Sequence, residues 1–264
     1  MFKLKNPSGY MFSSLGQDIF HLLRGLGSYT LFTLEIIRNI FSGKVKFRHI
    51  LDQMIKIGID SLPITVITLT FVGMVFTNQV TKEFFKIGAG KIIGGIVGFA
   101  VWRELGPLFA GVVVAARVGA AISSEIAAMK VTEQLDALRS MAINPFSYLY
   151  VPRFIALVTM MPILIIFADF VGFISGLGIY SILYHGNPVA YLSSASQMLT
   201  SLDIYGGILF KGPVFGFIIA SFSIFIGAHT KPGAVGIGES AIFSVVSILI
   251  TLFIVNFFLS YFIF

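Results

Sequence analysis

The stretch that decides the fold is residues 102–153, WRELGPLFAGVVVAARVGAAISSEIAAMKVTEQLDALRSMAINPFSYLYVPR. Its first part, up to Ala121, is apolar or small except for Arg103, Glu104 and Arg117. Charges in such a segment are costly in hydrocarbon unless they are paired or reached by water. This part therefore predicts a membrane-spanning helix whose charges have a structural or functional role.

The second part, residues 123–144, changes to an amphipathic pattern. Thr132 is placed to cap a turn that begins at Glu133, and Asn144-Pro145 ends the helical pattern. Apolar residues recur at steps of three and four, as on a helix with one apolar face: Ile126, Met129, Leu135, Leu138 and Met141. Such a helix between two spans is predicted to lie at the membrane surface, with one face free to meet another protein.

The whole chain is too apolar for a soluble globular domain. Of its 264 residues, 56% are hydrophobic and 11% charged, and the mean hydropathy is +0.94. These values and the pattern along the chain predict an all-α membrane protein with five transmembrane helices, an N-terminal amphipathic interfacial helix and a cytoplasmic amphipathic helix. The predicted spans are residues 57–80, 92–122, 154–184, 206–228 and 240–264.

The N-terminal region, residues 1–56, is basic and precedes the membrane domain, residues 57–264. Between residues 13 and 42 the apolar residues keep helical spacing and the charged ones fall largely on the other side, which predicts a helix lying in the interface. Of the net charge of +6, five units precede the first span. An anionic cytoplasmic leaflet explains this better than nucleic acid does. With the N-terminus inside, twelve Lys and Arg fall on the cytoplasmic side and four outside.

The predicted second span, residues 92–122, is long and contains Gly106-Pro107. Each half alone is too short to cross a bilayer, so the pattern favours one kinked helix over two. Two small-residue motifs, Gly172-x-x-x-Gly176 and Gly212-x-x-x-Gly216, hint at close helix packing. The chain has no Cys, and its four His lack ligand spacing, so no metal site is expected.

Four segments carry a resemblance to a known family. They are RELGP (103–107) and ARVGAAISSEIAAMKVTEQLDALRSMAINPFSYLYVPR (116–153), with weaker similarity in SLPITVITLTFVGMVF (61–76) and ADFVGFISG (168–176). Together they resemble the signature of the MlaE permease family, the membrane subunits of lipid ABC transporters that work with MCE-domain proteins. One departure is Ala116, which stands where the family usually has Gly.

The resemblance implies the permease subunit of a transporter that moves phospholipids or related lipids, and not an enzyme. It implies a homodimer, an MCE-domain protein on the periplasmic or outer side, and a bacterial inner membrane or a plastid inner envelope. ATP is expected to bind to a separate ABC ATPase subunit, since this chain has no Gly-x-x-x-x-Gly-Lys-Ser/Thr loop, and no cofactor is expected on the chain itself. The coupling helix would be residues 125–144, with contacts to the ATPase from Glu125, Lys130, Glu133, Gln134, Leu135 and Leu138.

Arg103 and Glu104 are the first candidates for substrate binding. Neighbours on a helix point about 100° apart, so the two are poorly placed to pair with each other. Either they line a central cavity, where Arg103 meets a lipid phosphate, or they fix helix packing through other partners. The apolar wall for acyl chains is expected from Phe71, Val72, Val75 and Phe76.

Asp169 lies near the middle of the third predicted span, where a packing role and a transport role both stay open. Two other functions compete with the permease. One is an ion-coupled secondary transporter working through Asp169 and Glu104, although no inverted repeat is evident. The other is a membrane-embedded lipid-modifying enzyme, which lacks a recognisable nucleophile or metal cluster.

Overall fold

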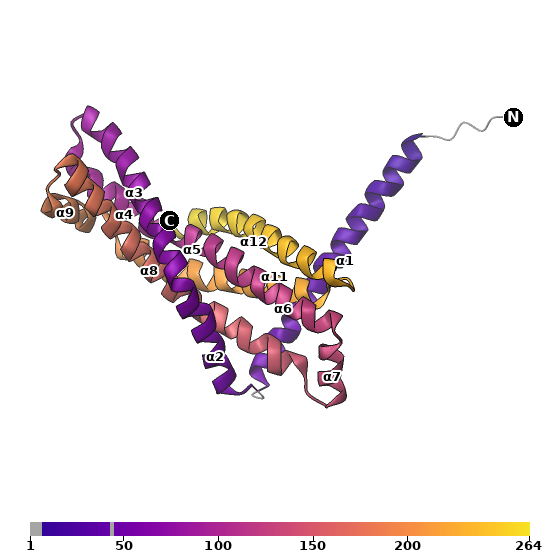
Figure 1. Cartoon of the computed structure of the whole chain (residues 1–264). Helices are drawn as coiled ribbons and strands as arrows, with labels where there is room; N and C mark the ends of the chain where they lie inside the picture. Colours follow the sequence, from indigo (N-terminus) through magenta and orange to yellow (C-terminus); the bar gives the residue numbers. More distant parts are fainter. Residues whose placement is uncertain (1–6, 43–44) are drawn as a thin grey trace.

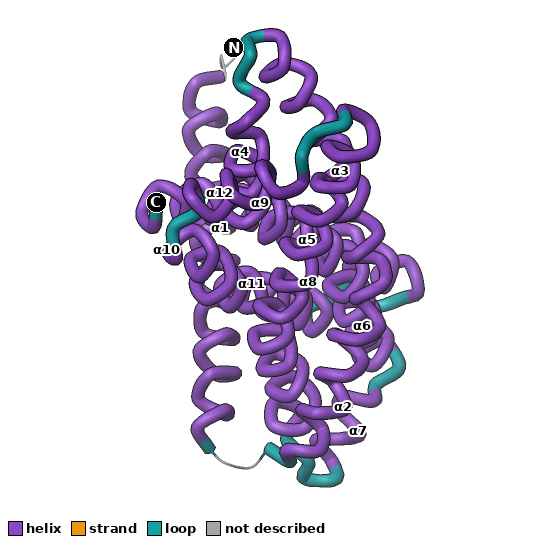
Figure 2. The backbone as a smooth tube through the Cα atoms, turned by 90° about the vertical axis from the view of Figure 1, so that its left-hand side faces the viewer, coloured by secondary structure: helices purple, strands orange, loops and turns teal. Residues whose placement is uncertain are grey.

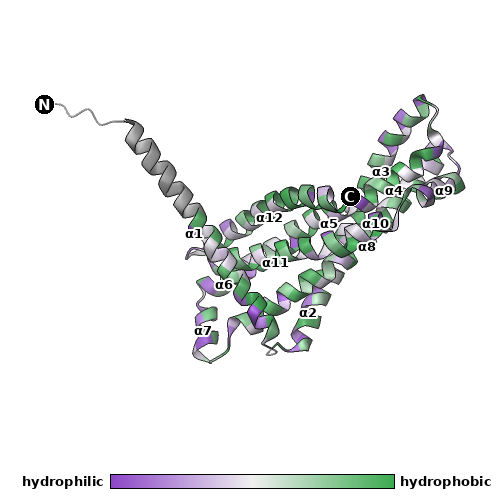
Figure 3. Ribbon diagram, turned by 180° about the vertical axis from the view of Figure 1, so that it is seen from behind, coloured by the Kyte–Doolittle hydropathy of each residue, from purple (hydrophilic) through white to green (hydrophobic). Residues whose placement is uncertain are grey.

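The computed structural model describes residues 7–42 and 45–264, with side chains from residue 23 onward, and these residues form helices without strands. Hydrophobic residues predominate along the helices of the bundle (Figure 3), and many large ones are exposed on its outside. The prediction of an all-α protein with five membrane spans is confirmed. The five helical runs long and apolar enough to cross a membrane are Phe47–Lys86, Gly90–Val131, Phe146–Tyr184, Ser201–Ala228 and Ala234–Ile263.

The first run joins α2 (Phe47–Gly58) to α3 (Leu62–Lys86) through a 3₁₀ turn, Ile59–Ser61. Pro63 fits here because the first turn of a helix leaves its N–H groups without intrahelical partners. The helical run therefore crosses the boundary predicted between residues 56 and 57.

The second run is one long helix in three parts, α4 (Ile93–Ala100), α5 (Gly106–Val114) and α6 (Ala120–Val131). Two π-helical segments, Val101–Leu105 and Ala115–Gly119, connect them without interrupting the helix. The preference for one kinked helix over two is confirmed, because the wider π turns absorb the irregularity.

The segment predicted as one helix over residues 125–144 is divided in the structure. Helix α6 continues to Val131, and the chain then turns at Glu133, whose φ of 57° is left-handed. The short helix α7 (Gln134–Ser140) follows. Thr132 does not cap it, because its hydroxyl donates back to the Ala128 carbonyl of α6 at 2.8 Å.

The third run consists of a π-helical segment, Phe146–Tyr150, and α8 (Val151–Tyr184). The polar connection after it forms two helices, α9 (Pro188–Met198) and α10 (Ser201–Tyr205). Helix α9 packs closely on α4: a Cβ at Gly94 would collide with the Tyr191 carbonyl.

The last two runs complete the bundle. A π-helical segment, Gly206–Lys211, leads into α11 (Gly212–Ala228), and α12 (Ala234–Ile263) follows. Helices α7 and α9 lie at opposite ends of the molecule (Figures 1 and 2). The two ends of the bundle can thus be named by these helices.

Helix α1 (Pro7–Phe41) extends from the body of the protein, as Figure 1 shows. Its C-terminal part is attached by Tyr29, whose hydroxyl lies 2.6 Å from Ser221 Oγ, and by Phe32, whose ring contacts Phe146 and Phe225. The side chains before residue 23 lie outside the described part. That this helix lies in the membrane interface stays a prediction.

Glycines allow the spans to approach closely. A Cβ at Gly73 of α3 would collide with the Gly172 carbonyl of α8, and one at Gly176 would meet Thr77 Oγ1. On the other side of α8, a Cβ at Gly216 of α11 would lie 2.5 Å from the Leu157 carbonyl. The small-residue motifs are therefore packing sites, as their spacing suggested.

Candidate functional site

The Glu104 carboxylate is the centre of a polar cluster inside the bundle. Its Oε2 lies 2.9 Å from Lys211 Nζ and accepts a hydrogen bond from Asn256 Nδ2 at 3.0 Å. Lys211 Nζ also donates to Ser260 Oγ at 2.8 Å. The cluster thus joins the second, fourth and fifth spans, and it keeps the lysine charge paired within the protein.

The third acceptor for this lysine is the backbone carbonyl of Arg103, which Pro107 leaves free. Because proline has no N–H, the Arg103 carbonyl four residues earlier lacks its usual helical donor. Lys211 Nζ donates to that carbonyl at 2.7 Å. The three protons of the fully buried Lys211 ammonium therefore have three acceptors.

The two π-helical segments that carry Glu104 and Lys211 pack against each other. A Cβ at Gly207 would lie 2.6 Å from the Trp102 carbonyl and 3.1 Å from Pro107 Cγ. Only glycine allows this approach without a backbone shift. The wide turns and Gly207 together set the position of the ion pair.

Arg103 points away from Glu104, as its place in the sequence predicted. Its guanidinium lies over the Phe264 ring at 3.9 Å from the centroid and over Phe99 at 4.8 Å. No carboxylate among the described side chains pairs with it. Arg103 and Glu104 are both only half-buried, so the edge of the cluster is accessible to a ligand from outside the chain.

Of the four residues predicted to form an apolar wall, two face outward. The side chains of Phe71 and Val75 are 63% and 55% exposed. Val72 and Phe76 pack instead against the protein's own core. The four residues therefore divide between two faces of α3 and do not form one wall.

Asp169 lies in α8 with its side chain fully buried. Its carboxyl group occupies the space where a Cβ at Gly106 would stand, and neither oxygen has a hydrogen-bond partner in the described part of the chain. It therefore lies against Gly106, two residues after Glu104 along the second run. The packing role and the transport role of Asp169 both stay predictions.

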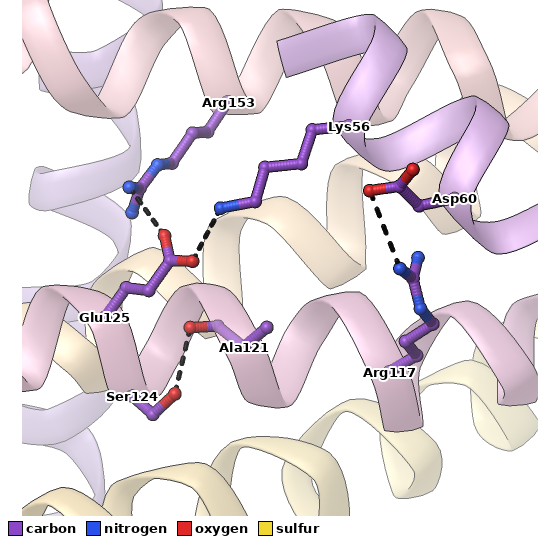
Figure 4. Close-up of polar contacts among 7 residues, drawn as sticks. All are labelled: Lys56, Asp60, Arg117, Ala121, Ser124, Glu125 and Arg153. Atoms are coloured by element: carbon purple, nitrogen blue, oxygen red, sulfur yellow. Dashed lines mark hydrogen bonds and ion pairs between the residues drawn. The ribbon is translucent and has the colours of Figure 1, made fainter.

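The predicted ATPase contacts fall in two different places. Glu125 and Lys130 belong to α6, and Glu125 makes ion pairs within the protein (Figure 4). At α7, Glu133 and Gln134 are exposed, Leu138 is half-buried, and Leu135 is buried at 5% exposure. Leu135 therefore anchors α7 to the protein, and the face that remains free is polar.

Three residues of the cluster were not among the predicted site residues: Lys211, Asn256 and Ser260. A sequence signal for Lys211 exists, because Lys211 directly precedes Gly212-Pro213, and Glu104 stands two residues before Gly106-Pro107. In both places an intramembrane charge precedes a Gly-Pro pair. Asn256 and Ser260 carry no such signal, since polar residues of this size are common in spans.

Comparison with known proteins gives the family. The profile described as Permease MlaE matches residues 50–262. The chain belongs to the MlaE permease family. It is an integral, multi-pass membrane protein and the permease subunit of an ABC-type transporter, not an enzyme.

Relatives from several organisms agree with this family. A Synechocystis protein named "Probable ABC transporter permease protein" is 45% identical over 232 residues, 88% of each chain. One from Rickettsia prowazekii with the same description is 37% identical, over 92% of this chain and 93% of its own. The chloroplastic Arabidopsis thaliana protein TRIGALACTOSYLDIACYLGLYCEROL 1 is 37% identical, over 92% of this chain and 69% of its own.

Proposed function

We propose that this permease moves phospholipids or related lipids, with Arg103 meeting the anionic headgroup at the edge of the Glu104–Lys211 cluster. The observation that carries the proposal is a charged cluster inside the spans whose arginine has no carboxylate partner among the described side chains. A phospholipid headgroup carries an anionic phosphate, and a guanidinium binds phosphate well. The name of the Arabidopsis relative, which contains that of a glycerolipid, agrees with a lipid cargo.

The working unit in this proposal is a homodimer. Within the two outer spans that contain α3 and α12, 22% and 17% of the most hydropathic window is buried, against 44% to 56% in the other three. Exposed aromatic residues line both helices, including Phe71 on α3 and Phe253 and Phe257 on α12. These faces supply a surface for a second copy and an apolar path for acyl chains.

A separate ATPase subunit supplies the energy and binds at α7, which lies on the cytoplasmic side in this proposal. An MCE-domain protein takes part on the opposite side, at the α9 end. The membrane is a bacterial inner membrane or a plastid inner envelope. Support comes from the charge distribution of the sequence and from the exposed polar residues of α7.

The docking part is tested by co-purification of a tagged chain with the ATPase expressed beside it. Glu133→Lys reverses a charge on the exposed turn before α7, and we expect it to reduce the retained ATPase strongly. Glu83→Lys is the matched control, because Glu83 is exposed at the opposite end of the bundle. Equal retention in both variants would contradict docking at α7.

The lipid part is tested by photocrosslinking in the membrane. A photoreactive residue in place of Phe71, at an exposed position of α3, is expected to capture phospholipid in an ATP-dependent amount, as measured by mass spectrometry. Ile182, 78% exposed on α8, is the control position for bulk lipid. If nucleotide changes the yield equally at both positions, α3 does not line the path.

A further inference from the structure

The carboxylate of Glu125 lies between two cations that belong to two other helices (Figure 4). Its Oε1 is 2.7 Å from Lys56 Nζ of α2, and its Oε2 is 2.8 Å from Arg153 Nη2 of α8. Each oxygen therefore holds one neighbouring helix. One side chain of α6 ties together the starts of the first and third spans.

The two cations differ in how strongly they depend on Glu125. The side chain of Arg153 is 8% exposed, and its Nε and Nη1 have no hydrogen-bond partner in the described part of the chain. Lys56 is 57% exposed and is reached by water. Loss of the Glu125 charge would leave a buried guanidinium uncompensated, whereas loss of Lys56 would remove only the tie to α2.

A second contact further along the same helical run has the opposite polarity. Arg117 Nη1 donates to Ser61 Oγ at 2.7 Å, and Arg117 Nη2 lies 3.8 Å from Asp60 Oδ2. Lys56 and Asp60 are one turn apart on their run, so a shift of about 5 Å along the helix axis would bring Glu125 toward Asp60, a like charge. The two contacts therefore define one register between the first and second spans.

The helices are not tightly packed between these two contacts. A cavity of about 100 Å³ lies there, lined among others by Lys56, Arg117, Ala121 and Glu125. A space of this size with charged walls holds water. The charges therefore act beside the buried apolar side chains of Ile57, Val118 and Ile122 in setting the register, and the hollow leaves room for a second arrangement.

Glu125 is also close to the point where force from α7 would arrive. Helix α6 ends at Val131, six residues after Glu125 or about 9 Å along the axis. In the described part of the chain α7 packs mainly on α6. A displacement of α7 therefore reaches α6 first, and Glu125 is the first charged link from α6 to other spans.

We propose that Glu125 is a positioning residue for transport, which passes the movement of α7 to α2 and α8 through its ion pairs with Lys56 and Arg153. The inference rests on the proposed function, since it takes α7 as the site where the ATPase acts. It replaces the earlier assignment of Glu125 as an ATPase contact. The residue couples hydrolysis to transport without touching either the lipid or the ATPase.

The experiment uses the chain in complex with its ATPase subunit, in proteoliposomes of phosphatidylethanolamine and phosphatidylglycerol with a fluorescent phosphatidylglycerol. The variants are Lys56→Met and the double variant Glu125→Gln/Arg153→Met, which removes the buried guanidinium together with its carboxylate. Lys86→Met is the control, an exposed ion-paired lysine at the far end. Unfolding temperature, ATP hydrolysis and lipid transfer are measured for each.

We expect Lys56→Met and the double variant to fold, bind the ATPase and hydrolyse ATP. The amount of lipid moved per ATP should fall about tenfold, an effect in the range seen for residues that couple distant sites. The control should keep the wild-type ratio. If either variant folds and keeps the wild-type ratio of lipid moved to ATP hydrolysed, the proposal for Glu125 is overturned and the proposed function stays intact. Wild-type complex that moves no lipid overturns the proposed function, and the proposal for Glu125 with it.

A second measurement separates coupling from stability. The chain contains no Cys, so spin labels can be attached to Ile55→Cys on α2 and Thr159→Cys on α8 without background. In the otherwise wild-type chain, ATP is expected to change the distance between the labels. In Lys56→Met and in the double variant this change should be lost. If ATP changes the label distance by the same amount in these variants, the role of Glu125 is contradicted.

Discussion

Two carboxylates, Glu104 and Glu125, each join three helices, yet their surroundings differ. Glu104 pairs with a lysine that is fully buried, and Glu125 pairs with one that is 57% exposed. Inside the spans, the backbone itself changes to supply acceptors, through a π turn and a proline that frees a carbonyl. Near the α7 end, the exposed Lys56 is open to water, and the backbone of α6 stays regular.

The comparison indicates how a membrane protein accommodates charge. Deep in the bundle a charge needs a complete set of partners, because hydrocarbon offers none. At the exposed Lys56 an ion pair can form and break at small cost, because water replaces the lost partner, whereas Arg153 of the same cluster is buried. The first arrangement suits a fixed binding site, and the second suits a joint that moves.

The largest effect is expected for Lys211→Met, which keeps the length of the side chain and removes its charge. Glu104 would lose its cation, and the Arg103 carbonyl would lose its donor. Breaking a buried pair in this way costs about 3 kcal/mol or more. Thermal unfolding in detergent measures it, with Lys231→Met at an exposed position as the control. Equal unfolding temperatures of the two variants would show that the contacts of Lys211 with Glu104 and the Arg103 carbonyl do not stabilise the protein.

A smaller loss is expected for Gly207→Ala, which leaves every charge in place. The new methyl group would meet the Trp102 carbonyl and force the two π-helical segments apart, at about 1–3 kcal/mol. Gly178→Ala is the control, because nothing lies within 4 Å of its Cβ position. An alanine that is tolerated equally well at both positions would show that the close approach at Gly207 is not required.

Ser260→Ala removes one acceptor from Lys211 and leaves the ion pair intact. We expect a loss of about 1 kcal/mol, the usual value for one hydrogen bond to a buried partner. Ser193→Ala, at an exposed position of α9, serves for comparison in the same unfolding assay. A loss as large as that of Lys211→Met would mean that Ser260, and not Glu104, is the main partner of the lysine.

The smallest effect on stability is expected for Lys56→Ala at the α7 end. An exposed pair contributes less than about 1 kcal/mol, and salt screens it. The loss should disappear at high ionic strength, whereas that of Lys211→Met should persist. Unfolding measured at low and high salt checks both, and a salt-independent loss at Lys56 would remove the contrast between the two clusters.

The sequence was sufficient for the spans and for the isolation of Arg103 from Glu104. Both follow from local rules, since about 20 apolar residues cross a bilayer and neighbours on a helix point in different directions. The boundaries near α7 were not predicted correctly, because the left-handed turn at Glu133 has no glycine or asparagine to mark it. The burial of Leu135 was missed for a related reason, as an amphipathic pattern does not say which partner covers its apolar side.

The sequence by itself determined that this chain is a five-span permease of the MlaE family, because length, hydropathy and a dense motif are properties of contiguous residues. Only the tertiary structure decided which charges meet. Lys211 finds Glu104, and Glu125 finds Lys56 and Arg153, across 28 to 107 positions of sequence. Such pairings depend on how the helices cross and on where π turns rotate the side chains, and no local pattern encodes that geometry.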